Sequence, residues 1–366
     1  MAAENRNPFN PSFGKVPSIF IDREEYIDEI SEGLSNLDSP WQTTMVSGVR
    51  GVGKTAFLAD VCRRFEKKKQ WIVADIASNG HVLDTLVQSV HEKASTDVRK
   101  AIDAIEGVSI SLFGIGAGYT TGKEKINYQL LLEKILKELQ KKNKYLLVAI
   151  DEVVPTKQIR QFAAIYQIMV RKNYPIALIM TGLPKNISEL QNDNTLTFLL
   201  RSSRVNLPLL DEVAVQYSYK EVFERSKKEI SLKTLRRMTA LTNGYSYAFQ
   251  LLGFLVWNTG ADRVTDETLD AVMYKYKEQL FRNAYSKIYE ELSKVDRDFV
   301  LAMAAGDEDS VTMKEIAGRM GKKNNYISTY KRRLIDNGVI KAEQYGSVEF
   351  ALPLFKDYLI EFRLEE

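Results

Sequence analysis

Apolar and polar residues change their spacing along the chain, and these changes predict where strands, helices and domains begin. Apolar or β-branched runs typical of strands occur at four places: residues 43–47, 71–76, 145–150 and 176–181. Segments with apolar residues at helical spacing separate these runs, which predicts an α/β domain with a three-layer parallel sheet. From Asp211 to about Tyr289 the spacing is almost purely helical, with breaks at Gly244 and Gly260, so we predict a helical lid there.

The C-terminal segment has the pattern of a separate small module. Helices are predicted at 296–304, 313–320 and 324–336, and strands at 339–342 and 348–352. Thr312 is placed to cap the second helix, Gly321 to end it, and Gly338 to end the third. Three helices followed by a hairpin, with its turn at Tyr345 and Gly346, predict a winged helix-turn-helix.

The patterns divide the chain into four predicted parts. These are an N-terminal strap and first helix at 1–40, an α/β core at 41–205, the helical lid at 206–290 and the winged helix at 291–366. The glycine-rich segment Gly107–Gly122 fits none of them clearly. A hairpin at the sheet edge or a partly disordered loop is favoured there over a mobile insertion that senses a partner, and we assign it no chemistry.

Residues 48–55 match a phosphate-binding loop in full. They read Gly-Val-Arg-Gly-Val-Gly-Lys-Thr, which fits G-x-x-x-x-G-K-[ST], and they lie between a strand pattern and a helical pattern as that motif requires. Lys54 would reach the β- and γ-phosphates, and the Thr55 hydroxyl would bind Mg²⁺. The predicted nucleotide-binding residues of this segment are Val49, Arg50, Gly51, Val52, Gly53, Lys54, Thr55 and Ala56.

A second motif ends the apolar run at 145–150. Asp151 and Glu152 follow this run directly, as expected for a buried parallel strand that ends in two carboxylates. Asp151 would hold Mg²⁺, and Glu152 would polarise the attacking water. The alternative is an acidic helix N-terminus that only satisfies a helix dipole.

Composition narrows the remaining chemistry. The 366 residues, 45% of them hydrophobic, suffice for two or three domains with substantial cores. The single cysteine, Cys62, excludes an intramolecular disulfide and is predicted to be a packed hydrophobe. Only His81 and His91 are available for a histidine-based zinc site or Ser-His-Asp chemistry. Without a membrane span or an apolar signal core, we expect a cytoplasmic protein with no membrane partner.

Positive charge gathers in the C-terminal module, although the net charge of the chain is only +3. Between Thr312 and Ala342 the acidic residues are Glu315 and Asp336, whereas the basic ones are Lys314, Arg319, Lys322, Lys323, Lys331, Arg332, Arg333 and Lys341. The predicted contacts to double-stranded DNA are Lys322, Lys323, Asn325, Tyr326, Lys331 and Arg333. The alternative is that this winged helix binds a partner protein or another part of its own chain.

Together these motifs resemble a family. The chain resembles bacterial P-loop ATPases of the AAA+ superfamily that carry a C-terminal winged helix, relatives of archaeal ATPases and of origin-recognition ATPases. The matching segments cover nearly the whole chain: Asn7-Pro8-Phe9, Phe13-Gly14, Pro17, Phe20 to Glu24, Gly48 to Thr55, Ile150 to Glu152, Met180 to Pro184, Phe198 to Arg201, Asn243 to Tyr245, Gln250 to Gly253 and Tyr330 to Leu334.

The resemblance implies further site residues. Thr181 is similar to the polar sensor of the γ-phosphate, and Arg201 or Arg204 to the arginine that reaches a phosphate, in cis or from a neighbouring subunit. A surface ion pair remains an alternative for both arginines. The strap around Ile21 is expected to wrap the base side of the nucleotide.

Two departures from the family pattern stand out. Asp22 replaces the usual glycine of the Phe20–Glu24 segment, which alters the expected turn near the adenine. In the lid, Tyr245, Ser246 and Tyr247 stand where the origin-recognition branch has an arginine and the signalling ATPases favour a proline after the glycine. The lid's own nucleotide sensor is therefore expected to be absent or replaced by backbone and packing contacts.

The sequence thus predicts an ATP-dependent switch with ATP and Mg²⁺ as cofactors, associated with DNA through its winged helix. The alternative is a signalling-type switch with little turnover, whose winged helix makes intramolecular or protein contacts and does not bind DNA. A homo-oligomer or a protein partner is compatible with either function.

Overall fold

The computed structural model describes residues 6–12, 19, 23–78, 80–104 and 127–364. Its contacts divide the chain into two compact units. The sheet unit contains Arg23–Ser47 and Lys54–Leu207, and the helical unit contains Met1–Asp22, Gly48–Gly53 and Pro208–Glu366. The segment Gly107–Gly122 and the residue Ile21 lie outside the described residues.

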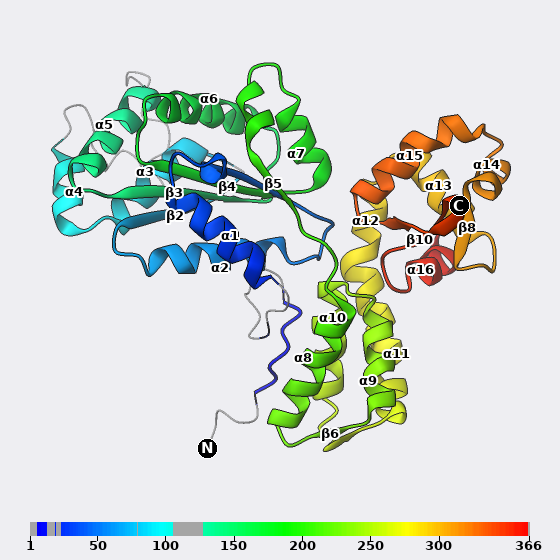
Figure 1. The fold of residues 1–366 in the computed structure, drawn as a ribbon. Helices are drawn as coiled ribbons and strands as arrows, with labels where there is room; N and C mark the ends of the chain where they lie inside the picture. The colour runs from blue at the N-terminus through cyan, green and yellow to red at the C-terminus, as the bar shows by residue number, and fades with distance from the viewer. Residues whose placement is uncertain (1–5, 13–18, 20–22, 79, 105–126, 365–366) are drawn as a thin grey trace, which may run out of the picture. The chain divides into compact units, whose positions relative to one another are not determined.

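Five parallel strands form the centre of the sheet unit, in the order β2-β3-β4-β1-β5 (Figure 1). Their bounds are β1 Thr43–Ser47, β2 Trp71–Ala77, β3 Tyr145–Asp151, β4 Ile176–Gly182 and β5 Ser203–Asn206. The first four lie where the apolar runs predicted strands. Their interior residues are buried, as the near-continuous apolar composition requires of a sheet covered on both faces.

Helices cover both faces of this sheet, with α1 and α2 on one side and α5 and α6 on the other (Figure 1). The helices of the unit are α1 Glu24–Ser35, α2 Lys54–Glu66, α3 Val82–Lys93, α4 Thr96–Asp103, α5 Tyr128–Lys141, α6 Lys157–Arg171 and α7 Pro184–Gln191, with short 3₁₀ turns at Pro40–Gln42 and Thr197–Arg201. Each of the longer helices buries one apolar stripe; α5, for example, buries Leu132, Ile135 and Leu139. The result is the predicted three-layer arrangement.

The lid forms the first part of the helical unit. Its helices are α8 Glu212–Arg225, α9 Leu232–Thr242, α10 Ser246–Trp257 and α11 Asp266–Leu280, and its two short strands, β6 Glu229–Ile230 and β7 Arg263–Val264, pair in parallel. Gly244 separates α9 from α10 with a positive φ of 70°. A Cβ at this position would lie 2.3 Å from the Leu210 carbonyl oxygen, so only glycine fits here without a shift of the backbone.

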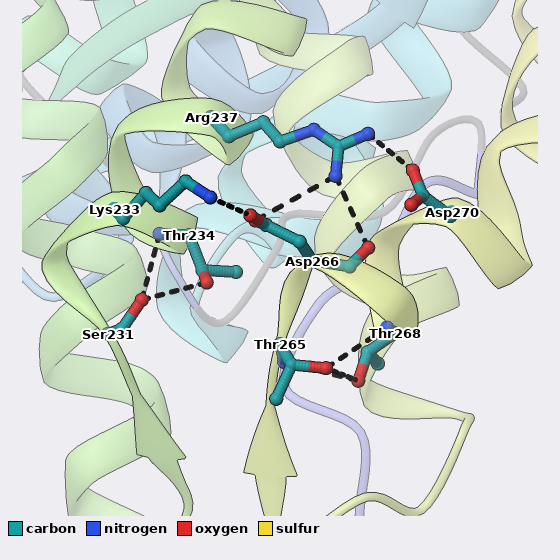
Figure 2. A network of polar contacts seen from close by, with 8 residues as sticks. All are labelled: Ser231, Lys233, Thr234, Arg237, Thr265, Asp266, Thr268 and Asp270. Carbon is teal, nitrogen blue, oxygen red and sulfur yellow. Dashed lines mark hydrogen bonds and ion pairs between the residues drawn. The ribbon is translucent and has the colours of Figure 1, made fainter.

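A polar network closes the end of the lid beside β6 and β7 (Figure 2). The Lys233 Nζ lies 2.9 Å from the Asp266 Oδ2, and Arg237 bonds to the carboxylate of Asp270. Ser231 and Thr265 cap the helices α9 and α11. The ammonium group of Lys233 lowers the pKa of Asp266. This network ties the start of α9 to the start of α11.

The described part of the strap packs on the lid. Phe9 is 1% exposed, and its ring lies against Phe249 of α10 with 5.7 Å between the centroids. The Asn7 Nδ2 donates to the Phe254 carbonyl at 3.0 Å. A Cβ on Gly253 would lie 2.4 Å from the Phe9 ring, so glycine makes room for the strap. The expectation that the strap wraps the base side of a nucleotide stays a prediction, and its named contact, Ile21, lies outside the described residues.

The C-terminal module follows a π-helical turn, Phe281–Tyr285, and α12, Ser286–Glu291. Its elements are α13 Lys294–Ala304, β8 Ser310–Thr312, α14 Met313–Met320, α15 Asn324–Asp336, β9 Ile340–Ala342, a 3₁₀ turn at Gln344–Gly346, β10 Ser347–Phe350 and α16 Phe355–Phe362. The strands form an antiparallel sheet in the order β8-β10-β9. The three predicted helices and the hairpin are present, whereas β8 and α16 had no predicted counterpart.

Aromatic packing joins this module to the lid. Tyr285 of the π-helical turn contacts Phe355 at 5.1 Å between ring centroids, and its hydroxyl donates to the Pro353 carbonyl. The Lys277 Nζ lies 2.6 Å from the Asp357 Oδ2. Lid and C-terminal module therefore belong to one compact unit.

Candidate functional site

Two predicted motifs meet at the carboxyl edge of the sheet. The Thr55 hydroxyl, in the first turn of α2, donates to the Asp151 Oδ2 at 2.7 Å although 96 positions separate the two residues. The other carboxylate oxygen, Oδ1, accepts a hydrogen bond from the Thr181 hydroxyl. The sheet order explains this meeting, because β4, which carries Thr181, lies between β3 and β1.

Glu152 has an unusual backbone conformation. Its φ is 47°, in the left-handed region that a residue with a Cβ adopts only at a cost. Two hydrogen bonds hold the residue there: its N–H donates to the Thr181 Oγ1 at 3.2 Å, and its carbonyl accepts from the Ser78 Oγ at 2.8 Å. Glu152 itself is exposed. Residues at strand ends that are held in a strained conformation are typical of functional sites.

The predicted phosphate-binding lysine begins α2. Lys54 is 7% exposed, which is rare for a lysine, and Thr55 beside it is half-buried. Cys62 on the same helix is 5% exposed, and burial raises the pKa of its thiol, so it is the packed hydrophobe that the sequence suggested rather than a nucleophile. The start of α2 thus places the Thr55 hydroxyl at the acidic edge, directly after the buried Lys54.

The loop Gly48–Gly53 precedes α2 in the chain and packs within the helical unit. Gly51 and Gly53 have positive φ values of 79° and 100°, and the Val52 N–H donates to the Val49 carbonyl at 3.2 Å. These are features of a tightly turned loop. The residues predicted to hold phosphates therefore form such a loop, followed directly by Lys54 and Thr55.

The first turn of α10 touches this loop through three hydrogen bonds. The Tyr245 hydroxyl donates to the Arg50 carbonyl at 2.7 Å, the Ser246 hydroxyl to the Val52 carbonyl at 2.9 Å, and the Tyr247 N–H to the Gly51 carbonyl at 3.1 Å. At these three residues the sequence predicts that the lid lacks its own nucleotide sensor.

The loop also contacts the chain beyond the lid. The guanidinium of Arg50 lies 2.8 Å from the Glu291 carboxylate at the end of α12. Val49 lies next to Gly338 just after α15, where an added Cβ would come within 3.2 Å of the Val49 Cβ. The loop thus has two neighbours beyond the lid, Glu291 at the end of α12 and Gly338 in the C-terminal module.

The two candidate arginines differ in their surroundings. Arg201 is exposed at the end of the 3₁₀ turn Thr197–Arg201. Arg204 is exposed on β5, where its Nη2 donates to the Leu200 carbonyl at 3.4 Å. Neither arginine forms an ion pair with another of the described residues. The surface ion pair considered for them is therefore not found in that part of the chain.

The predicted DNA-contacting residues lie on α15 or just before it, and one of them is engaged elsewhere. The Arg333 Nη2 lies 2.6 Å from the Oδ1 of Asp296, whose side chain is 3% exposed, and donates to the Ser293 hydroxyl at 2.7 Å. Of the other basic residues, Arg319 pairs with Glu308 and Lys341 with Glu349. Arg333 is consequently a structural residue of the module in this arrangement.

The remaining predicted contacts lie in the segment 322–331, just before α15 and in its first part. Tyr326 is 44% exposed, its ring lies 5.2 Å from that of Tyr330, and the Lys322 Nζ lies 5.7 Å from the Tyr326 ring centroid. Lys323 and Asn325 are exposed and Lys331 is half-buried. Ile327 and Leu334 are 0% exposed, as the sequence predicted for the core side of the helix.

Sequence reasoning missed several contacts at these sites. Ser78 carries no motif, and its role at Glu152 depends on β2 lying next to β3. The bonds from Tyr245 and Ser246 end on backbone carbonyls, which leave no mark in a sequence. Arg332 belongs to the basic segment but not to the predicted DNA contacts, and it is exposed on α15.

Comparisons with known proteins identify one matching family model and several solved structures of similar fold. A family model described as a domain of unknown function, DUF8462, matches residues 282–359. No curated protein matches the chain. A Walker-type ATPase of Pyrococcus abyssi is similar in structure, with a TM-score of 0.62 at 15% identity, over 94% of this chain and 96% of that one.

A second archaeal structure is similar to the same extent. It is the ORC2 protein of Aeropyrum pernix in ADPNP–ADP complexes, with a TM-score of 0.61 at 13% identity, over 96% of this chain and 95% of that one. At sequence identities this low, the structural similarity establishes the fold of this chain but not its activity. The predicted fold class is therefore confirmed: the chain has the fold of a P-loop AAA+ domain followed by a helical C-terminal region.

Proposed function

We propose that this protein is an ATP-binding and Mg²⁺-dependent ATP-hydrolysing switch of the AAA+ type. The observation that carries the proposal is the hydrogen bond of 2.7 Å between Thr55 and Asp151. It brings the lysine-threonine end of the phosphate loop and the acidic strand end to one place, as phosphoryl transfer requires. The similar structures support adenine as the base, because one is described as an ATPase and the other as a complex with ADPNP and ADP.

Each residue at this edge has a role in the proposal. Lys54 and the N–H groups of the loop hold the phosphates. Glu152 orients the attacking water and accepts its proton, which suits an exposed carboxylate held by its backbone. Thr181 fixes Glu152 and Asp151 relative to each other through its one hydroxyl. Arg201 and Arg204 remain candidates for a phosphate contact.

The residues present fit a magnesium ion. Thr55 and Asp151 offer neighbouring hydroxyl and carboxylate oxygens, the donor type that Mg²⁺ prefers. Among the described residues no group of three or more His, Cys, Asp or Glu side chains forms a metal cage. Mg²⁺ commonly takes one or two protein ligands together with substrate phosphates, so this small donor set is sufficient. When bound, the ion neutralises charge on the phosphates.

The test measures nucleotide binding and hydrolysis by the full chain. Wild type should bind ATP with an affinity that requires Mg²⁺ and should release phosphate. Lys54→Ala should weaken ATP binding by about tenfold or more, because it removes the ammonium group from the phosphates. Lys67→Ala, which changes an exposed lysine just after α2, is the matched control and should behave as wild type. A wild-type chain without Mg²⁺-dependent affinity for ATP would contradict the proposal.

A second function, association with double-stranded DNA, is favoured by the basic residues just before α15 and on it. Lys322, Lys323, Lys331 and Arg332 form no ion pair with other described residues, whereas Arg333, Arg319 and Lys341 do. Exposed cations next to Tyr326 at the start of a helix are suited to phosphates and a groove. The occupied Arg333 makes Lys323 and Lys331 the better positions to test.

The DNA test compares affinity at several salt concentrations. Lys323→Ala and Lys331→Ala should each weaken duplex binding and reduce the salt slope by about one. Lys294→Ala, an exposed lysine at the start of α13, is the control. Unchanged DNA affinity in both α15 variants would remove this function. Together with very slow turnover and co-purified ADP, that outcome would favour the signalling-type switch.

A further inference from the structure

Three donors at the start of α10 reach the carbonyl oxygens of the loop. All three hydrogen bonds from the first turn of α10 end on carbonyl oxygens of consecutive loop residues, Arg50, Gly51 and Val52. In each planar trans peptide the C=O and the following N–H point in opposite directions. When the carbonyls of Arg50 and Val52 are turned toward α10, the N–H groups of Gly51 and Gly53 are turned away from it. That is the orientation in which loop amides face a phosphate.

The fit between Tyr245 and Gly51 is close. A Cβ at Gly51 would lie 2.1 Å from the Tyr245 hydroxyl oxygen, and the φ of Gly51 is 79°. The phosphate-loop motif accepts any residue at this position. Glycine here is therefore explained by the tyrosine that lies over it and by the backbone turn.

The residues that donate these hydrogen bonds are themselves held in place by burial and by further contacts. Tyr245 is 0% exposed, and burial raises the pKa of its hydroxyl, so the group stays a donor throughout the ordinary pH range. The Tyr247 hydroxyl accepts a hydrogen bond from the Asn283 Nδ2 at 3.0 Å, in the π-helical turn after α11. The ion pair between Arg50 and Glu291 adds an anchor from α12. The loop is thus held from outside by groups with fixed positions.

We infer that the first turn of α10 clamps the carbonyl side of the phosphate loop, and that Tyr245 and Ser246 are positioning residues that keep the loop amides ready for phosphates. This inference rests on the proposed ATP site. Tyr245 and Ser246 act through the loop backbone and do not need to contact the nucleotide. The clamp lowers the free energy of the binding-competent loop, so its loss reduces the competent fraction and raises the apparent dissociation constant.

The experiment measures the KM and kcat of MgATP hydrolysis, and the dissociation constant of MgADP, with the full chain. Tyr245→Phe removes one hydroxyl and keeps the ring over Gly51. It should raise KM and the MgADP dissociation constant by about threefold to tenfold, the effect of one lost hydrogen bond, with kcat within about twofold. Ser246→Ala should act in the same direction through the Val52 carbonyl, and Ser246→Thr, which keeps a hydroxyl, should recover most of the loss.

Tyr219→Phe is the matched control. The Tyr219 hydroxyl is also fully buried and donates to a carbonyl, that of Phe249, at 2.7 Å inside the lid. This variant should lower the melting temperature about as much as Tyr245→Phe and leave nucleotide affinity unchanged. A general loss of lid stability would instead weaken nucleotide binding in both variants.

The outcomes separate the clamp from the ATP site itself. If wild type binds MgATP but Tyr245→Phe and Ser246→Ala both bind as tightly as wild type, the clamp is wrong and the proposed function stands. Tighter binding by the two variants would also overturn it, because the lid would then hold the loop in an unproductive conformation. If wild type binds no nucleotide, the proposed function fails first.

Discussion

The two regions that would hold a nucleotide differ in the kind of hydrogen bond that holds them in place. At the acidic edge of the sheet unit, side chains bond to side chains: Thr55 and Thr181 both donate to the carboxylate of Asp151. In the loop Gly48–Gly53, lid residues bond to backbone carbonyls instead. The geometry of the first region depends on the residues at which the buried strands end. The geometry of the second depends on the contact between α10 and a glycine-rich turn.

The two regions should therefore tolerate different kinds of amino-acid substitution. A site made of side chains at strand ends loses its activity when one functional group is changed, because each oxygen atom has a different role. A loop held by its carbonyls accepts any side chain that keeps the backbone path, but it depends on donors that come from elsewhere in the chain. We therefore expect changes at the sheet edge to alter the chemical step and changes at the clamp to alter affinity.

The largest effect is expected for Glu152→Gln. The amide retains the shape of the side chain but cannot accept a proton, so hydrolysis should fall by about a hundredfold or more while ATP binding is retained. Phosphate release and nucleotide binding are measured on the same preparation. Glu189→Gln, an exposed glutamate on α7, is the control and should hydrolyse normally. A Glu152→Gln variant that hydrolyses at the wild-type rate would remove Glu152 from its role.

Thr181→Val should affect both stability and hydrolysis. Thr181 is 0% exposed, and its loss leaves the Glu152 N–H and one Asp151 oxygen without their partner. We expect the free energy of unfolding to fall by about 1–3 kcal/mol. Thr44→Val is the matched control, because that buried hydroxyl donates to the Trp41 carbonyl at 2.7 Å on β1. Equal hydrolysis in the two variants would show that Thr181 only stabilises the sheet.

Glu152→Gly tests the backbone strain separately from the carboxylate. Glycine adopts the φ of 47° without the Cβ penalty, so this variant should be inactive and yet more stable than Glu152→Ala by about 1 kcal/mol. Chemical denaturation of the two variants measures the difference. Equal stability would mean that the left-handed conformation at Glu152 stores no strain.

The smallest effect is expected for Asp266→Asn at the far end of the lid. Lys233 holds the folded-state pKa of Asp266 below its unfolded value of about 3.9, so the ionised carboxylate stabilises the fold above that pH. This contribution is lost as the pH falls through the lower folded-state pKa. Asp266→Asn should therefore lower the melting temperature slightly at pH 7, and the difference should shrink below about pH 4. Nucleotide affinity at pH 7 should be unchanged, in contrast to Tyr245→Phe.

Sequence patterns predicted the side-chain region better than the clamp. The strand ending in Asp151 and the helix beginning at Lys54 follow from an uninterrupted apolar run and a glycine-rich motif, and both are where those patterns indicate. The edge strand β5, Ser203–Asn206, was missed because it is short and buries only Val205. The bonds from α10 could not be predicted, since a backbone carbonyl has the same chemistry in every residue.

The contact between Val49 and Gly338 carries a thermodynamic consequence for the whole helical unit. Gly338 lies just after α15, and Val49 belongs to the loop Gly48–Gly53, which would receive phosphates. A ligand that displaces the end of α15 would change the surroundings of Val49 in the loop. Linkage makes such an influence reciprocal: whatever factor a duplex applies to the affinity for nucleotide, nucleotide applies to the affinity for the duplex.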